Sequence, residues 1–157
     1  MGITFSIYGY FCLMGYSKGN HTTYHHRYHI VWITKYRYKI LTGNLQRRVR
    51  QLLAQVASEM NIKILNGVVS SDHIHIFCSI PPQIAVSDFV KKAKGRSSRK
   101  VQQEFPDLKN RYWGKHFWSR GYFSSTSGNV TDEVINEYIN NHFDGNKPEN
   151  EENISLE

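Results

Sequence analysis

Side-chain alternation in HIHIFCSI, residues 73 to 80, is the feature that most constrains the fold. Successive side chains of a β-strand point to opposite faces of its sheet. One face then consists of Ile74, Ile76, Cys78 and Ile80, and the other of His73, His75, Phe77 and Ser79. Since the first set is entirely apolar, it must be buried. The segment predicts a strand with one face on the core and two imidazoles on the open face.

These two imidazoles are close enough to share an ion. Same-face neighbours on a strand are about 7 Å apart, and imidazole is the commonest protein ligand for transition metals. Taken alone, however, two histidines on a half-exposed strand occur more often without a metal. A metal site at His73 and His75 therefore needs support from elsewhere in the chain.

Hydrophobic periodicity predicts six further elements around this strand. Strands are expected over residues 28–34, 62–69 and 117–126, and helices over 44–61, 86–105 and 131–143. The helical core stripes are Leu45, Val49, Leu52, Val56 and Met60 in the first helix, and Phe89, Ala93, Ser97 and Val101 in the second. Asn44, Ser87 and Thr131 are the expected N-caps of the three helices.

The order of these elements is β-α-β-β-α-β-α, with a short turn at residues 70–72 joining the second and third strands. Its first six elements form the split βαβ arrangement. We expect an α+β fold of ferredoxin-like or RRM-like type: one antiparallel sheet, two helices on one face, and a C-terminal helix. The other face of the sheet is left open, and in this architecture that face often binds nucleic acid.

Charge is distributed unevenly along the chain, whose 157 residues carry a net charge of +7. The segment 145–157 holds four glutamates, one lysine and almost no apolar residues, so we expect a disordered acidic tail. The remaining residues are more basic than the total, which favours a polyanionic partner such as nucleic acid. We expect one folded domain over residues 21–144.

Residues 1–20 are expected to be an N-terminal extension. The first 15 are apolar but too short to span a bilayer, and they lack the basic start and cleavage site of a signal peptide. They are either a mis-called start that precedes Met14 or a loose arm. Cys12 and Cys78 are far apart in the sequence, which argues against a disulfide framework or a cysteine zinc site and suits a reducing cytoplasm.

A tyrosine and a histidine share one face of the last predicted helix. Tyr138 and His142 are four residues apart, so their side chains lie one turn from each other. In isolation Tyr138 suits an amphipathic core stripe with Val134 and Ile135. A tyrosine hydroxyl can also attack a phosphodiester, provided that a cation stabilises the developing charge. His73, His75 and His142 would supply that cation's ligands.

Basic residues mark two possible nucleic-acid contacts. One side of the second helix carries Lys92, Arg96, Arg99 and Lys100 without an acid of its own, and it is equally well explained by a solvated face or by phosphate contact. Residues 34–39, TKYRYK, interleave cations with aromatics, which suits single-stranded DNA or RNA. Gly95, within the helix, suggests close approach of another backbone.

Four more histidines crowd one region before and within the first strand. They are His21, His25, His26 and His29. Because their spacing matches no standard metal motif, we assign them no role.

Five segments resemble one known family in order and spacing. They are YHIVWITKYRYKIL, DHIHIFCSIPP, KKAKGRSSRKVQQEFP, WSRGYFSSTSG and VINEYINNHF. Together they are similar to the small single-tyrosine HUH transposases of bacterial insertion sequences, of the IS two-hundred/six-hundred-five type. The likeness extends from about Tyr24 to Phe143, most of the chain, and His73-Ile74-His75 is its His-hydrophobic-His motif.

The resemblance implies a concrete activity. Family members cut and rejoin single-stranded DNA at hairpin-bearing element ends with Mg²⁺ or Mn²⁺. It implies that Tyr138 is the nucleophile, leaving a 5′-phosphotyrosine, and that His73 and His75 are metal ligands. His142 stands where many members have glutamine as the third ligand. The basic candidates for DNA contact are Lys35, Arg37, Lys92, Arg96 and Arg120.

The resemblance also implies a homodimer in which two sheets join and the tyrosine helix of one subunit can complete the other's site. Two other functions remain open. One is a host-retained nuclease that cleaves chromosomal repeats, which differs only in genomic context. The other is a non-catalytic, RRM-like module whose exposed sheet aromatics stack on bases.

Overall fold

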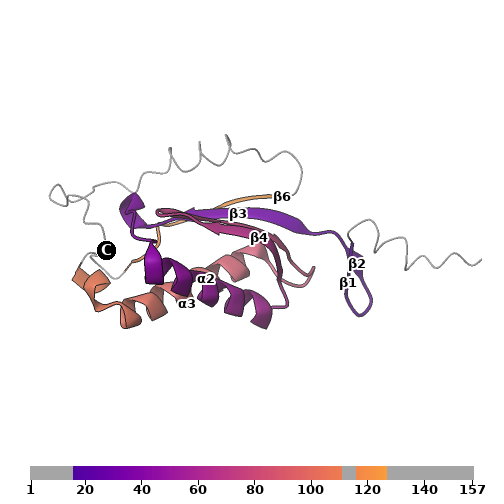
Figure 1. Ribbon diagram of the computed structural model, residues 1–157. Helices are drawn as coiled ribbons and strands as arrows, with labels where there is room; N and C mark the ends of the chain where they lie inside the picture. The colour runs from indigo at the N-terminus through magenta and orange to yellow at the C-terminus, as the bar shows by residue number, and fades with distance from the viewer. Residues whose placement is uncertain (1–15, 111–115, 127–157) are drawn as a thin grey trace, which may run out of the picture.

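The computed structural model describes residues 16–110 and 116–126 (Figure 1). Its main strands are β3 (Arg27–Ile33), β4 (Lys63–Val69), β5 (His73–Ser79) and β6 (Phe123–Thr126). The helices are α2 (Gly43–Glu59) and α3 (Val86–Glu104), with short 3₁₀ turns η1 (Lys35–Arg37) and η2 (Pro106–Asn110). A small ribbon, β1 (Ser17–Lys18) and β2 (Thr23–Tyr24), precedes them.

One four-stranded sheet organises the fold, in the order β4-β5-β3-β6. Every neighbouring pair in it is antiparallel. Figure 1 shows α2 and α3 together on one side of this sheet. The strand order, the pairing and the helix placement confirm the predicted split βαβ arrangement.

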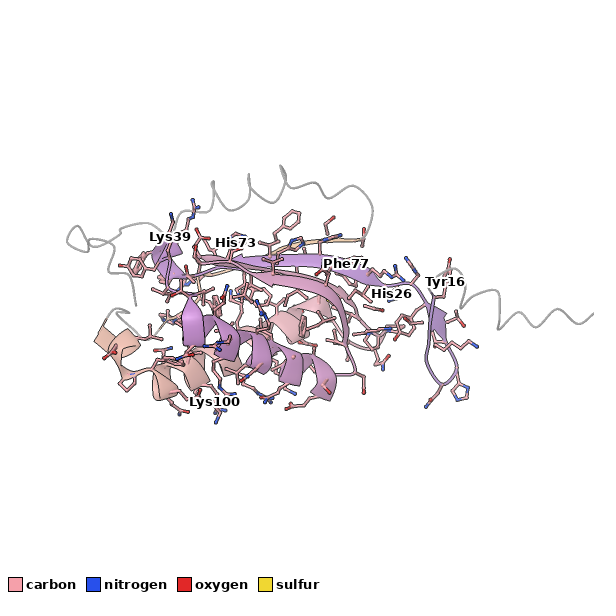
Figure 2. The ribbon with its side chains drawn as sticks, in the orientation of Figure 1. Tyr16, His26, Lys39, His73, Phe77 and Lys100 are labelled. Atoms are coloured by element: carbon pink, nitrogen blue, oxygen red, sulfur yellow. The ribbon has the colours of Figure 1, made fainter. Side chains whose placement is uncertain are left out.

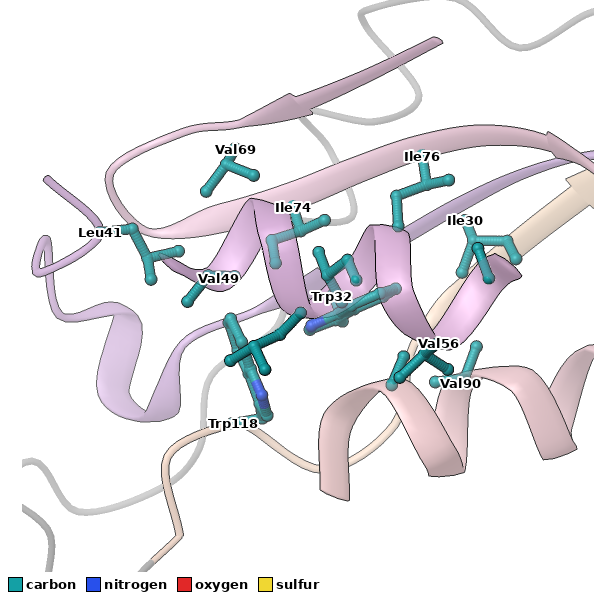
Figure 3. Packing of buried hydrophobic residues seen from close by; sticks show 14 of the residues in the cluster. Ile30, Trp32, Leu41, Val49, Val56, Val69, Ile74, Ile76, Val90 and Trp118 are labelled. Carbon is teal, nitrogen blue, oxygen red and sulfur yellow. The ribbon is translucent and has the colours of Figure 1, made fainter. Parts of the chain in front are cut away.

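A continuous apolar core fills the space between the sheet and the two helices (Figure 3). The predicted inward face of β5 is confirmed, since Ile74, Ile76 and Cys78 are at most 3% exposed. The helical stripes are confirmed as well: every predicted residue is buried except Met60, which is partly buried and packs against the core. Trp32 and Trp118 meet edge to face within this core, with ring centroids 6.1 Å apart.

Both described helices begin differently from the prediction. The N-cap of α2 is Thr42 rather than Asn44, and the N-cap of α3 is Ala85 rather than Ser87. Neither cap residue makes a side-chain hydrogen bond to its helix within the described part of the chain. Asn44 lies inside α2, where its Oδ1 accepts a hydrogen bond from Arg47.

The last strand of the sheet is shorter than predicted. β6 covers only Phe123–Thr126, and residue 118 forms an isolated bridge with Thr34. Between them, Lys94 of α3 donates hydrogen bonds to the carbonyl oxygens of Ser119 and Gly121. Gly121 has a φ of 77°, which favours glycine. The chain turns here and is tied to the helix layer instead of continuing the sheet.

The β1–β2 ribbon extends beyond the first residues of β3, at the side of the sheet where that strand begins (Figure 1). Ser17 pairs with Tyr24 and Lys18 with Thr23, so the predicted boundary at residue 20 falls inside this ribbon. The Oγ atoms of Ser17 and Ser79 are 3.4 Å apart, which joins the ribbon to β5. The predicted helix 131–143 and acidic tail 145–157 lie outside the described residues, as do residues 1–15. Within the described part, no helix is long and apolar enough to cross a membrane.

Candidate active site on the open face of the sheet

The candidate site lies on the sheet face opposite the helices. In the antiparallel register, Ile33 faces His73, Val31 faces His75, and His29 faces Phe77 across β3 and β5. Since these residues alternate with the core residues along each strand, they share the open face. Val31 and Ile33 are nevertheless at most 1% exposed. The face therefore has a dry apolar floor beside the histidines instead of being uniformly solvated.

His73 is oriented by a buried carboxylate. Its Nδ1 lies 2.8 Å from Oδ1 of Asp72, and Oδ2 of the same carboxylate accepts a hydrogen bond of 3.3 Å from the Arg37 guanidinium. Asp72 is only 7% exposed. The hydrogen bond from His73, aided by the charge of Arg37, holds the pKa of the Asp72 carboxyl below its usual range. Because a carboxylate oxygen only accepts, this contact makes Nδ1 of the neutral His73 ring the nitrogen that carries the hydrogen and leaves Nε2 as the one with a lone pair.

The turn that carries Asp72 is clamped to the end of β3. Thr34 donates to the Asp72 carbonyl oxygen from both its backbone nitrogen, at 2.9 Å, and its Oγ1, at 3.2 Å. Within the turn, the Ser70 nitrogen donates to the His73 carbonyl at 2.9 Å. The predicted turn at 70–72 is confirmed, and its position against the end of β3 sets where His73 begins its strand.

Two strained residues stand next to this carboxylate. Tyr36 and Arg37 have φ values of 56° and 55°, in the left-handed region that non-glycine residues rarely occupy. Conformations of this kind cost about 1–3 kcal/mol and persist where the surroundings enforce them. Here the Arg37–Asp72 ion pair and the hydrogen bond from the Arg37 nitrogen to the Thr34 carbonyl hold the turn. The strain brings a guanidinium to the carboxylate behind His73.

His75 is paired with a histidine to which the sequence assigned no role. Nδ1 of His29 lies 3.0 Å from Nε2 of His75. The ring of His29 also stacks on Phe77, with centroids 4.4 Å apart and an interplanar angle of 19°. Burial lowers the pKa of His29 below its usual value. Antiparallel pairing of β3 with β5 brings His29 to His75, a contact between the two rings that the sequence did not predict.

The donor chemistry of this face fits a divalent cation. His73 has the carboxylate partner common among metal-ligating histidines, and His75 faces a second imidazole nitrogen. Among the described residues, however, no group of three or more histidine, cysteine, aspartate or glutamate side chains is placed to hold a metal. Tyr138 and His142, the predicted nucleophile and third ligand, lie outside the described residues. The described face therefore presents two imidazoles with defined polar partners, and no complete set of metal ligands within the described residues.

Three of the basic residues predicted to contact DNA, Lys35, Arg37 and Arg120, differ in what their side chains contact. The ammonium of Lys35 lies 4.9 Å from the centre of the Tyr36 ring, a cation–π contact. Arg37 is engaged with Asp72, so its charge supports the His73 turn. Arg120 is exposed in the segment that leads to β6.

The basic residues of α3 lie on the opposite side of the molecule. Figure 2 shows Lys100 on the outer side of the helix layer and His73 at the sheet. The sequence of α3 alone does not show that these charges are partly matched: Glu59 of α2 accepts contacts from both Lys92 and Arg96. The hydrogen bond from Arg96 is the main reason that the pKa of Glu59 falls to about 2. Neighbouring helices supply the counter-charge that one helix alone does not contain.

An open depression of about 460 Å³ remains on that outer surface. It is lined by Asp88, Lys91, Lys92, Gly95, Arg96 and Arg99. A Cβ built on Gly95 meets no described atom within 4 Å. The expected close approach of another backbone at Gly95 is therefore not seen among the described residues, and the glycine opens onto this basic depression.

Comparison with known proteins assigns the whole arrangement to one family. Residues 22–142 match the family described as "Transposase IS200 like". The chain is 33% identical over 127 residues to the ISDra2 transposase TnpA of Deinococcus radiodurans, which covers 81% of this chain and 91% of that protein. It is 37% identical over 127 residues to the transposase for insertion sequence element IS200 of Salmonella typhimurium, which covers 81% of this chain and 83% of that protein.

Solved structures agree with the sequence comparison. A crystal structure at 1.90 Å resolution, of a protein from Deinococcus radiodurans R1 assigned as a transposase, superposes with a TM-score of 0.74 at 32% identity and covers 80% of this chain and 96% of that one. A REP-associated tyrosine transposase bound to a REP hairpin shares the fold, with a TM-score of 0.51 at 14% identity, covering 78% of this chain and 68% of that one. The family match and the two relatives lead to one conclusion: this chain belongs to the IS200-like transposases.

Proposed function

We propose that this transposase cuts and rejoins single-stranded DNA at the hairpin-bearing ends of an insertion sequence, through a covalent intermediate on Tyr138. The observation that carries the proposal is the placement of His73 and His75 on the open sheet face, with Nδ1 of His73 already bound to Asp72. The relative that is a transposase for an insertion sequence supports the choice of element. The fold neighbour bound to a REP hairpin supports a hairpin substrate.

The chemical step is a transesterification. The Tyr138 oxygen forms a bond to the phosphorus while the bond from phosphorus to the 3′-oxygen breaks, giving a 5′-phosphotyrosine and a free 3′-hydroxyl. The phenol loses its proton to a base or to water, and the leaving 3′-oxygen gains one. A 3′-hydroxyl then attacks the phosphotyrosine and releases Tyr138. No water consumes the phosphodiester, so the strand can be rejoined.

We assign the metal site to His73, His75 and His142, with Mg²⁺ or Mn²⁺ as the ion. When bound, such an ion polarises the phosphate and stabilises its developing negative charge. Asp72 keeps the proton of His73 on Nδ1, so that Nε2 stays deprotonated for the ion. The buried floor of Val31 and Ile33 excludes water from one side of the histidines, which strengthens electrostatic interactions there.

DNA contacts are assigned to two basic surfaces. Lys35 lies in η1, directly after β3, and Arg120 is exposed in the segment before β6; both are candidates for contact with the single strand. Arg37 contributes indirectly, through the Asp72 carboxylate. Lys92 and Arg96 line the depression on α3 and suit phosphates of a duplex stem, although Glu59 reduces their net charge. We place the protein in the cytoplasm, which suits both a DNA substrate and the two cysteines of the sequence, which form no paired motif.

The protein works as a homodimer in this proposal. Within the described sheet, β4 is an edge strand with two exposed apolar residues, Leu65 at 37% and Val68 at 52%. An exposed edge offers unpaired backbone groups to a second strand. Joining two β4 edges would bring the two open faces together and allow Tyr138 of one subunit to serve the other. Val68→Lys should convert the dimer to a monomer in sedimentation; an unchanged dimer would place the interface elsewhere.

The proposal is tested by trapping the covalent intermediate. The full chain is incubated with a hairpin-ended single strand and Mn²⁺, and a slower-migrating protein–DNA adduct is measured on a denaturing gel. Tyr138→Phe should abolish the adduct, whereas the control Tyr16→Phe should retain it. An adduct formed by Tyr138→Phe, or none from wild type on any element-end substrate, would refute the mechanism.

The same experiment distinguishes the proposed transposase from the main alternative, a non-catalytic binding module of RRM-like type. That reading is favoured by Phe77, an aromatic on the central strand β5 of the open face. Phe77 is already stacked on His29, which leaves less of its ring for a base. A binding module would retain the hairpin DNA in a gel shift without forming any adduct.

A further inference from the structure

We propose that the ring of Tyr36 stacks on the base of the single strand that lies next to the cut phosphate, with the ammonium of Lys35 binding a neighbouring phosphate. The inference rests on the proposed function, because it names a binding site for the same single-stranded DNA. Both residues belong to η1, the turn that follows the end of β3. Ile33, the last residue of β3, pairs with His73 across the sheet.

The turn that carries Tyr36 is attached to the candidate active site. The next residue, Arg37, donates a hydrogen bond of 3.3 Å to one carboxylate oxygen of Asp72, and the other oxygen lies 2.8 Å from Nδ1 of His73. Figure 2 shows Lys39, two residues after the turn, at the same end of the sheet as His73. A base stacked on Tyr36 would therefore belong to a nucleotide beside the phosphate at the histidines.

The left-handed backbone of the turn is accompanied by different surroundings for three successive side chains. Arg37 meets the buried carboxylate of Asp72, and Tyr38 packs against the apolar core. Tyr36 is only partly buried and is not one of the described residues that pack against this core. Strained backbone of this kind is frequent at sites that hold a ligand. The turn keeps a guanidinium on Asp72 while the aromatic ring one residue earlier stays at the surface.

The Tyr36 ring has no parallel ring stacked on it within the described part of the chain. Its aromatic neighbour Tyr38 is tilted by 56°, with ring centroids 5.5 Å apart. Phe77 on the sheet differs, because His29 already stacks on it at an interplanar angle of 19°. Among the aromatics near the histidines, Tyr36 is therefore the better platform for a base.

A cation already lies over this ring. The ammonium of Lys35 is 4.9 Å from the centre of the Tyr36 ring. Because the lysine stem is long and flexible, the ammonium can leave the ring for a phosphate and open that face to a base. Proteins that bind single strands combine the same two contacts: aromatic rings stack on bases, and cations pair with the backbone phosphates.

The test measures stacking without cleavage. The full chain with Tyr138→Phe is the parent protein, EDTA is present, and the cleavage point is first mapped with wild type. Hairpin-ended single strands then carry the fluorescent base 2-aminopurine at one position at a time around that point, and stacking on a ring quenches its fluorescence. Quenching is expected at one or two positions beside the cut phosphate. Adding Tyr36→Ala should abolish it and weaken binding of the strand about 5- to 150-fold.

Further variants separate the ring from the turn. Tyr36→Phe keeps the ring and should bind the strand like the parent protein. Tyr36→Gly suits left-handed backbone, so it removes the ring without adding strain and should lose as much binding as Tyr36→Ala. Tyr16→Ala is the matched control: Tyr16 is 38% exposed and lies at the other end of the sheet from His73 in Figure 2, so binding should not change.

Three results would overturn the inference. Unchanged quenching and affinity in Tyr36→Ala would remove this ring from the DNA site. A loss in Tyr36→Phe as large as in Tyr36→Ala would assign the contact to the hydroxyl and not to stacking. Equal effects at every labelled position would mean that no single base is bound there. If wild type forms no adduct, the proposed function itself fails; an adduct from wild type without stacking at Tyr36 refutes this inference alone.

Discussion

The two faces of strand β5 differ in how their side chains are held. On the inner face, Ile74, Ile76 and Cys78 are enclosed by apolar neighbours from the sheet and both helices. On the outer face, Nδ1 of His73 lies 2.8 Å from a carboxylate oxygen of Asp72, and Nε2 of His75 lies 3.0 Å from Nδ1 of His29. Apolar packing is non-directional, whereas an imidazole needs a partner at a defined nitrogen. The same strand thus stabilises the fold through one face and positions reactive groups through the other.

The largest predicted effect is a difference in unfolding free energy between variants of the inner and outer faces of β5. Ile74→Ala removes a fully buried side chain and should lower the free energy of unfolding by about 3 kcal/mol. His73→Ala, one residue earlier on the outer face, should lower it by less than about 1 kcal/mol but abolish the DNA adduct. Urea unfolding of both variants measures the difference. Similar losses of stability would mean that the outer face is also structural.

A smaller effect concerns the support behind His73. Asp72→Asn keeps the size of the side chain but removes the carboxylate that binds Nδ1. We expect Mn²⁺ affinity to fall about 10- to 100-fold, as is usual for partners of metal-ligating histidines. Isothermal titration of the full chain measures the affinity, with Asp88→Asn on α3 as a control. Equal affinities in wild type and Asp72→Asn would remove Asp72 from the site.

The apolar core also contains side-chain hydrogen bonds, and one of them refines the comparison between the two faces of the sheet. The buried Trp118 Nε1 donates to Ser97 Oγ at 2.9 Å. Ser97→Ala leaves this donor without its partner and should cost about 1–2 kcal/mol of unfolding free energy. Ser87→Ala, at the exposed start of α3, should cost nothing measurable, because Ser87 is not the N-cap. A large loss from Ser87→Ala would restore the capping role predicted from the sequence.

The smallest predicted effect is the pH dependence of the outer face. The pKa of Asp72 is lower in the folded protein than its ordinary value of 3.8. Its contribution to stability is therefore complete above the unfolded pKa and is lost as the pH falls through the folded pKa. The stability difference between wild type and Asp72→Asn should be constant between about pH 5 and 7 and shrink below about pH 4. Urea unfolding over this range provides the measurement; a difference that grew in acid would contradict the sign.

Patterns within one segment were sufficient for most of the fold. Alternation in β5 identified its core face, and the stripes of α2 and α3 identified theirs, because both depend only on the geometry of one element. The order of elements then predicted the sheet. Helix starts were less predictable: Asn44 and Ser87 have side chains suited to capping, but Thr42 and Ala85 occupy the caps, and neither makes a side-chain cap hydrogen bond in the described part of the chain.

Contacts between segments account for what the sequence did not reveal. His29 becomes informative only when the register of β3 against β5 is known, because 46 residues separate it from His75. Glu59 of a second helix contacts both Lys92 and Arg96 and offsets one of their two positive charges. Arg37 turns inward to Asp72 because two successive residues adopt left-handed backbone. Aligning β3 with β5 as antiparallel strands in the sequence and looking for histidines near each other across the pair would have predicted the contact between His29 and His75.

The buried thiol of Cys78 on β5 can be used to measure how often the sheet separates from the two helices. Burial raises the pKa of Cys78 to about 12, and the residue is fully enclosed. Alkylating reagents attack the thiolate, so Cys78 should react only when the sheet separates from the helices. With Cys12→Ser as the background, leaving one thiol in the chain, the labelling rate would measure how often the strand that carries the HUH motif is exposed. Comparing the labelling rate with and without Mn²⁺ would show whether an ion on the outer face of β5 slows the separation of its inner face from the helices.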